Sequence, residues 1–183
     1  MTTTTTTTAT TVSIERTDLL ELLATRRHFL AFTARDLTDA QAASTPTASA
    51  LSVGGLIKHV SRTEDSWARF VQGDASALGG GKAWSEWNDS DWAARAAEFR
   101  MEPGENLVDL LADYADVASR TDELVRTVPS LDASFALPSA PWFAPGAHRT
   151  VRQAFLHIAT ETAQHAGHAD IVRETIDGAK SMG

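Results

Sequence analysis

The sequence predicts an all-α protein, a four-helix bundle with long connections and a short extra helix between the second and third long helices. Apolar residues recur at helical spacing in four long segments, whereas no stretch alternates apolar and polar residues for long enough to indicate a strand. Amphipathic helices of this length bury their apolar faces against one another, which favours a bundle. The four segments are 15–36, 52–73, 105–128 and 150–177.

A connection of moderate length separates the first two predicted helices. The first helix is followed by a break and a short turn that begins at residues 37–39. Ser52 is the predicted N-cap of the second helix, because a serine hydroxyl can accept a hydrogen bond from a first-turn N–H group. Gly54 and Gly55 are poor helix formers near its start, and Gly73 is predicted to end it.

Two long irregular segments connect the remaining helices. Residues 73–91 contain three successive glycines and two tryptophans, and residues 129–147 contain four prolines. Loops of this length are often functional. The short extra helix is predicted at 91–99, with Asp89 or Ser90 as its cap, and Gly178 is predicted to end the last long helix.

A length of 183 residues fits one domain. We predict a disordered threonine-rich tail over 1–12 and a bundle domain over 13–183. Repeated threonine cannot bury enough apolar surface to offset the entropy of ordering. The chain has no cysteine, so it offers no disulfide, no thiolate metal ligand and no nucleophilic thiol of its own.

Charge and hydropathy exclude two classes of partner. Sixteen basic and twenty-four acidic residues give a net charge of −8, and no basic stripe is present, so we expect no nucleic-acid partner. No apolar run is long enough to cross a bilayer, and the start of the chain lacks the pattern of a signal peptide. We therefore expect a cytoplasmic protein that does not bind membranes.

A glutamate and three histidines share one face of the last predicted helix. Glu161 and His165 are four residues apart, which places them about 40° apart around the helix axis, close enough to bind one metal ion. His59 on the second helix would complete a His₂Glu site with an open coordination position, an arrangement typical of catalytic metal sites. His168 faces the same way, and helical geometry alone does not choose between His165 and His168.

A hydrogen-bonded polar core without metal is the competing interpretation. His157 and Glu161 share an arc with apolar Ala154 and Ile158, so all four are predicted to point into the core. A buried carboxylate without a partner is costly, and a divalent cation would remove that cost. Metal binding is therefore favoured, with His157 as a supporting neighbour rather than a ligand.

Three further residues are candidates for the surroundings of this site. Thr63 follows His59 by one turn, and Trp67 follows by one turn more, although Trp67 also fits a role in the core. Trp142 lies in the second long loop and could line the mouth of a pocket. The sequence has no Ser-His-Asp constellation, phosphate-binding loop or dinucleotide fingerprint, so no catalytic residue is predicted beyond the metal site.

Several segments carry a family resemblance. RRHFLAFTARDLTDAQ, ALSVGGLIKHV and HIATETAQHAGHADIVRETIDG, with the WF of the second loop, resemble the DinB-like family of metal-dependent four-helix proteins. Within it they resemble the actinobacterial branch that has ETAxHAGHAD in its last helix. The resemblance covers nearly the whole chain after the threonine tail.

This resemblance implies that His59, Glu161 and His165 hold a divalent metal, zinc or alternatively nickel, with His168 as a neighbour. Glutamate followed by histidine at the last-helix positions is the pattern of the branch that includes mycothiol-dependent maleylpyruvate isomerases. Those isomerases have an additional C-terminal domain that this sequence lacks, so the single-bundle thiol S-transferases fit better. The implied activity is transfer of a low-molecular-weight thiol, mycothiol, to an electrophile.

The absence of cysteine fits a thiol that arrives as a cosubstrate. The alternative function is a non-catalytic, stress-related protein whose pocket binds a metal or ligand. A homodimer is compatible with a bundle of this size, but no sequence feature specifies one.

Overall fold

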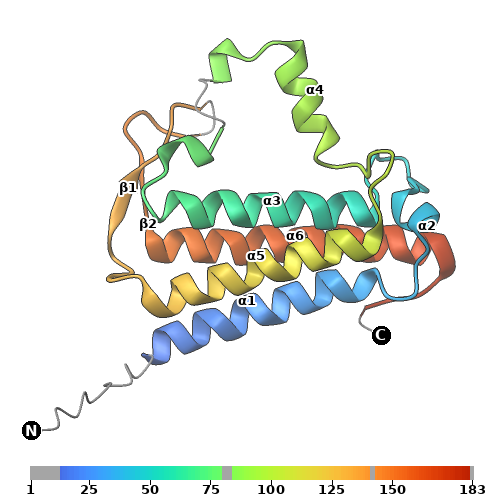
Figure 1. Cartoon of the computed structure of the whole chain (residues 1–183), viewed down its shortest axis with the longest axis horizontal. Helices are drawn as coiled ribbons and strands as arrows, with labels where there is room; N and C mark the ends of the chain where they lie inside the picture. The colour runs from blue at the N-terminus through green and yellow to red at the C-terminus, as the bar shows by residue number, and fades with distance from the viewer. Residues whose placement is uncertain (1–12, 80–83, 141–142, 182–183) are drawn as a thin grey trace, which may run out of the picture.

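The computed structural model describes residues 13–79, 84–140 and 143–181. Four long helices lie side by side along the molecule (Figure 1). They are α1 (Ile14–Thr33), α3 (Val53–Phe70), α5 (Leu107–Thr127) and α6 (Val151–Asp177). The predicted all-α four-helix bundle is confirmed. The division into a tail over 1–12 and a domain over 13–183 stays a prediction, because residues 1–12 lie outside the described residues.

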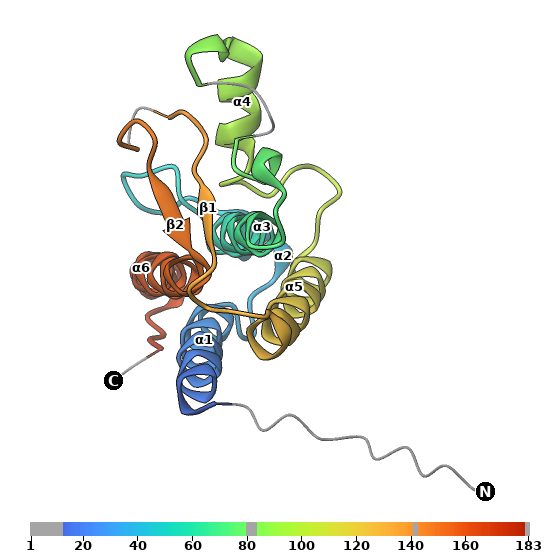
Figure 2. The ribbon, with the colours of Figure 1, turned by 90° about the vertical axis from the view of Figure 1, so that its left-hand side faces the viewer.

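Viewed along the bundle, α1 lies diagonally opposite α3, and α5 and α6 occupy the other two corners (Figure 2). Each long helix begins at a residue whose side chain accepts a hydrogen bond from the first turn. These N-caps are Ser13, Ser52, Asn106 and Thr150. Gly178, with a φ of 76°, ends α6 in the left-handed conformation that glycine adopts without strain.

Short elements fill the connections. A helix, α2 (Asp39–Ala43), replaces the turn predicted after α1, because Thr38 and Gln41 form a capping box around its first turn. Two single 3₁₀ turns, η1 (Ala75–Ala77) and η2 (Trp84–Glu86), interrupt the loop after α3. The short extra helix, α4 (Asp89–Ala97), is confirmed in position, but Asn88 caps it instead of Asp89 or Ser90.

Two strands were missed by the sequence analysis. Strands β1 (Ser134–Ala136) and β2 (His148–Thr150) pair antiparallel, with Phe135 opposite Arg149. Each strand has three residues, too few to show the alternation by which a strand is recognised. Together with α4, this hairpin lies on the side of α3 and α6 that faces away from α1 (Figure 2).

The apolar core is divided into two clusters along the bundle axis. One cluster contains Leu23, Phe70 and Phe155, and the other contains Leu30, Leu56 and Val172. Buried polar side chains from all four long helices lie along the bundle as well, namely Arg27, Glu64, Thr121 and Thr162. No helix formed by the described residues combines the length and the apolar character that a membrane span needs.

Candidate metal centre

The candidate ligands come from two neighbouring helices. His59 belongs to α3, whose residues from Val53 to Ser61 are all buried, so its side chain enters the molecule with only 2% of the residue exposed. Glu161 and His165 lie one turn apart on α6, as their spacing predicts. The structure thus brings together residues that are about a hundred positions apart in the chain.

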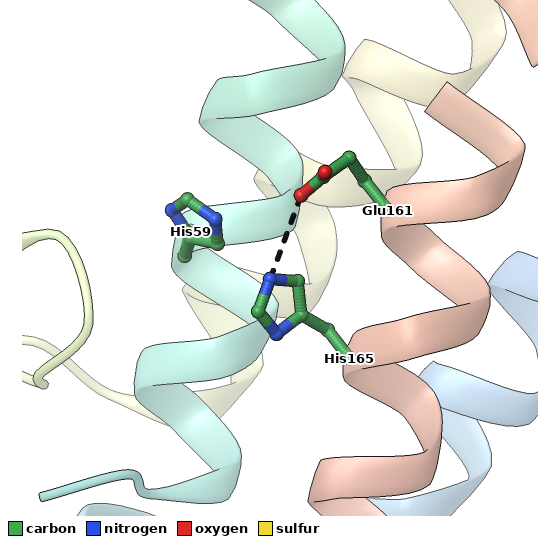
Figure 3. A group of neighbouring side chains, drawn as sticks. All are labelled: His59, Glu161 and His165. Atoms are coloured by element: carbon green, nitrogen blue, oxygen red, sulfur yellow. Dashed lines mark ion pairs between the residues drawn. The ribbon is translucent and has the colours of Figure 1, made fainter. Parts of the chain in front are cut away.

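One potential ligand atom from each of His59, Glu161 and His165 lies within 4.8 Å of the other two. In Figure 3 the Glu161 carboxylate and the His165 imidazole reach from α6 toward His59 on α3. His165 Nε2 lies 3.6 Å from Glu161 Oε2. The His59 and His165 ring centroids are 4.9 Å apart, and the rings are nearly perpendicular, at 83°.

The ionisation of these groups suits a cation. Burial lowers the pKa of His59, so its imidazole is neutral at neutral pH. The adjacent His165 imidazole lowers the pKa of Glu161 despite the opposing effect of partial burial, so this carboxylate is ionised. Neutral imidazole and ionised carboxylate are the forms that bind a divalent metal.

The donor set fits a divalent ion such as zinc or nickel. Two imidazoles and one carboxylate are common ligands of both metals, and three protein ligands leave a coordination position open. The buried Nδ1 of His59 has no hydrogen-bond partner among the described residues, an uncompensated polar atom at the edge of the cluster.

Two further histidines flank the cluster. His168 Nδ1 lies 3.4 Å from His165 Nδ1, on the side of that ring opposite the nitrogen that faces Glu161. His157 Nε2 lies 3.8 Å from Glu161 Oε1, and the His157 ring packs edge-on against Trp67 with centroids 4.6 Å apart. Burial lowers the pKa of His157, so it too is neutral at neutral pH.

A cavity of about 750 Å³ opens beside the cluster. Thr63 and Trp67 of α3 and His157 and Glu161 of α6 line it, together with residues of η1, α4 and the second long loop. His157 and Glu161 were predicted to point into the core, but their side chains are 30% and 28% exposed at the cavity wall. Trp142, the other candidate pocket residue, lies outside the described residues.

Glu98 and Phe99, which follow α4 directly, also lie at the site and were not predicted from the sequence. The Phe99 ring stacks on His59 with centroids 3.9 Å apart, and Glu98 Oε2 lies 3.8 Å from His59 Nδ1. No carboxylate shares the helical face of His59, and this one comes from a residue thirty-nine positions later. Spacing within one helix could not reveal it, because only the docking of the α4 segment brings it near.

Fold and site together define a DinB-like four-helix bundle with a candidate His₂Glu metal centre between α3 and α6. The sequence model of the mycothiol-S-transferase family matches residues 18–178. The chain therefore belongs to this family.

Comparison with solved structures supports the fold. The chain is similar to a conserved protein from Enterococcus faecalis, with a TM-score of 0.61 and 17% sequence identity, over 89% of this chain and 97% of that one. At this identity the likeness concerns the fold alone. No curated protein matches the chain.

Proposed function

We propose that this protein is a divalent-metal-dependent thiol transferase that joins a low-molecular-weight thiol, mycothiol, to an electrophilic substrate. Family membership supports a transferase related to mycothiol. The observation that carries the metal dependence is the convergence of His59, Glu161 and His165 beside an open cavity. We propose zinc as the ion, with nickel as the alternative.

The proposed roles of the residues follow from their positions. His59, Glu161 and His165 hold the cation between two helices that are fixed by the bundle. Trp67 and Thr63 form the cavity wall next to Glu161 and exclude water from part of the site. His157 and His168 contact Glu161 and His165 and orient them.

A divalent cation held by His59, Glu161 and His165 would supply positive charge that favours the thiolate form of an incoming thiol at neutral pH. In the proposed reaction the sulfur of the cosubstrate would form a bond to the electrophilic carbon, the bond to the leaving group would break, and the thiol proton would pass to water in the open cavity. The chain has no cysteine, so the sulfur must come from the cosubstrate.

The proposal is tested by incubating the zinc-loaded protein with mycothiol and a chromogenic electrophile. Conjugation is expected to exceed the rate without protein. His59→Ala and Glu161→Ala should lose bound metal, measured by elemental analysis, and conjugation together, while keeping their helical circular dichroism. His28→Ala, which removes an exposed histidine of α1, is the matched control and should keep both.

Other outcomes separate the alternatives. Stoichiometric metal without conjugation of any tested electrophile would favour a non-catalytic metal- or ligand-binding protein. Metal retained by both His59→Ala and Glu161→Ala would show that the ligand assignment is wrong. A cytoplasmic location and a homodimer stay predictions, testable by cell fractionation and by light scattering.

A further inference from the structure

Residues 98–101, which connect α4 to α5, dock directly on the first half of α3. A Cβ atom added at Gly55 would lie 1.9 Å from the carbonyl oxygen of Phe99, and one added at Gly54 would lie 2.3 Å from Met101 Sδ. At Gly55 the close atom belongs to the backbone, so a side chain there would block this approach, and glycine allows the segment to contact the helix. The glycine pair weakens a helix in isolation but creates a docking surface in the folded protein.

A lysine holds the same segment from the side. Lys58, only 5% exposed, donates a hydrogen bond to the carbonyl oxygen of Arg100 at 3.2 Å and another to Glu105 at 2.8 Å. Gly54, Gly55 and Lys58 precede His59 within one and a half turns of α3. The docking surface therefore ends at the candidate ligand.

Docking places two side chains against the far side of the His59 ring. Phe99 stacks on the imidazole at 24° between the ring planes, and the Glu98 carboxylate lies 3.8 Å from Nδ1. In Figure 3 one ring nitrogen of His59 faces the Glu161–His165 pair, and the other faces away from it. The nitrogen on the Glu98 side is Nδ1, to which the described residues offer no hydrogen bond, so Nε2 is offered to the cation.

We propose that Glu98 is a positioning residue for the metal centre: its carboxylate accepts the Nδ1–H of His59 and thereby fixes the tautomer and ring orientation that present Nε2 to the cation. The proposal rests on the proposed function. The present separation of 3.8 Å is longer than a hydrogen bond, so the two side chains must approach each other more closely when the cation is bound. Histidine ligands commonly donate their second N–H group to a carboxylate in this way.

A competing role for Glu98 is visible. Arg95, one turn earlier, forms an ion pair with the same carboxylate. If Glu98 served only to pair with Arg95 and hold the end of α4, its removal would leave the metal affinity unchanged. The Arg95 guanidinium also lies 5.4 Å from the centre of the Phe99 ring, so it holds both residues that touch His59.

Thermodynamic linkage gives a second consequence. If docking of residues 98–101 strengthens metal binding by some factor, metal binding strengthens docking by the same factor. Figures 1 and 2 show α4 standing away from the bundle, and the segment that follows it contacts α3. Zinc should therefore slow amide hydrogen exchange in residues 98–101 of the wild-type protein.

The test compares Glu98→Leu and Glu98→Gln with the wild-type protein by zinc titration against a competing chelator. Glu102→Leu, which changes an exposed glutamate of the same connection, is the matched control. Glu98→Leu should weaken zinc binding about 10–100-fold. Glu98→Gln keeps an acceptor oxygen, so its zinc affinity should lie between those of Glu98→Leu and the wild type. Glu102→Leu should bind zinc as tightly as the wild type. The slowing of exchange by zinc should be lost in Glu98→Leu.

Nitrogen-15 NMR of the histidine side chains supplies a direct check on the wild-type protein. Zinc-loaded His59 should carry a proton on Nδ1 and coordinate through Nε2. Coordination through Nδ1, or equal zinc affinity in Glu98→Leu and wild type, would overturn this inference and leave the proposed function standing. A wild-type protein that binds neither zinc nor nickel would overturn both.

Discussion

At the scale of single residues, Gly55 illustrates how a weak helix former can be required by packing. The atom that a Cβ would meet is a backbone oxygen, which cannot rotate away as the end of a flexible side chain could. The backbone around Phe99 would have to move as a whole. The same reasoning does not apply to Gly167 of α6, where a Cβ would meet no atom within 4 Å.

We expect Gly55→Ala to lower the free energy of unfolding by about 1–3 kcal/mol, because it overpacks the contact with Phe99. Gly167→Ala is the control and should raise it by roughly 0.5–1 kcal/mol, because alanine is the better helix former. Urea unfolding measures both. Equal effects of the two substitutions would mean that residues 98–101 do not press on α3 in solution.

At the scale of elements, a buried ion pair joins α1 to α3. The Arg27 guanidinium donates to both oxygens of Glu64, at 2.6 and 3.2 Å, and to Asp122 of α5 at 2.7 Å. Glu64 is completely buried, and Asp122 is 26% exposed. Glu64 therefore depends on Arg27 for its compensating charge, whereas Asp122 has access to water.

Arg27→Met should lower the free energy of unfolding by about 3–5 kcal/mol, because it leaves the Glu64 carboxylate buried without a countercharge. The double variant Arg27→Met/Glu64→Leu should recover much of the loss, since the charge that remains, on Asp122, has access to water. Urea denaturation monitored by circular dichroism tests both variants. A double variant no more stable than the single one would contradict this account.

The ion pair between Lys58 and Glu105 connects α3 to the segment before α5. Partial burial raises the pKa of Glu105, but hydrogen bonds from Lys58 and from the Glu102 backbone N–H, with the positive charge of Lys58, outweigh burial, and the pKa lies below its ordinary value of 4.5. A carboxyl whose pKa falls on folding stabilises the folded state above pH 4.5. This stabilisation is lost as the pH falls through the lower pKa of the folded protein.

Glu105→Gln should therefore lower the free energy of unfolding by about 1–2 kcal/mol at pH 7. The difference from the wild type should shrink as the pH falls below 4.5, because the wild-type carboxyl then becomes neutral too. Unfolding free energies measured from about pH 3 to about pH 7, a range that spans the titration of Glu105, test the prediction. A difference that stays constant with pH would show that the charge of Glu105 is not the cause.

At the scale of the whole molecule, a cation bound between α3 and α6 would link two helices whose ligands are distant in the chain. Binding to the folded state alone stabilises the protein through mass action. The three candidate ligands are brought together only by folding, so the unfolded chain should bind the ion weakly.

Zinc at about a hundred times its dissociation constant should raise the free energy of unfolding by about 2.7 kcal/mol. For a domain of this size the midpoint of thermal unfolding should rise by roughly 5–10 °C and fall back after a chelator is added. Glu161→Ala should show no shift. A shift of the same size in that variant would mean that zinc acts elsewhere.

The long helices and the shared face of Glu161 and His165 could be predicted from the sequence, because both depend on the spacing of residues within one helix. Apolar spacing predicted the four long helices, and the spacing between Glu161 and His165 predicted their common face. The strands β1 and β2 could not be predicted, since three residues carry too little pattern and each strand depends on the other. The exposure of Glu161 at a cavity wall was missed because a helical arc does not show what covers it.

By itself the sequence determined the four long helices, the absence of cysteine and the one-turn pairing of Glu161 with His165. The tertiary structure alone decided that His59 meets that pair and that Glu98 reaches the other side of the same ring. The physical reason is that helical spacing is a property of adjacent residues. Contacts between α3, α4 and α6 depend instead on how separate surfaces pack, as the approach of Phe99 to Gly55 shows.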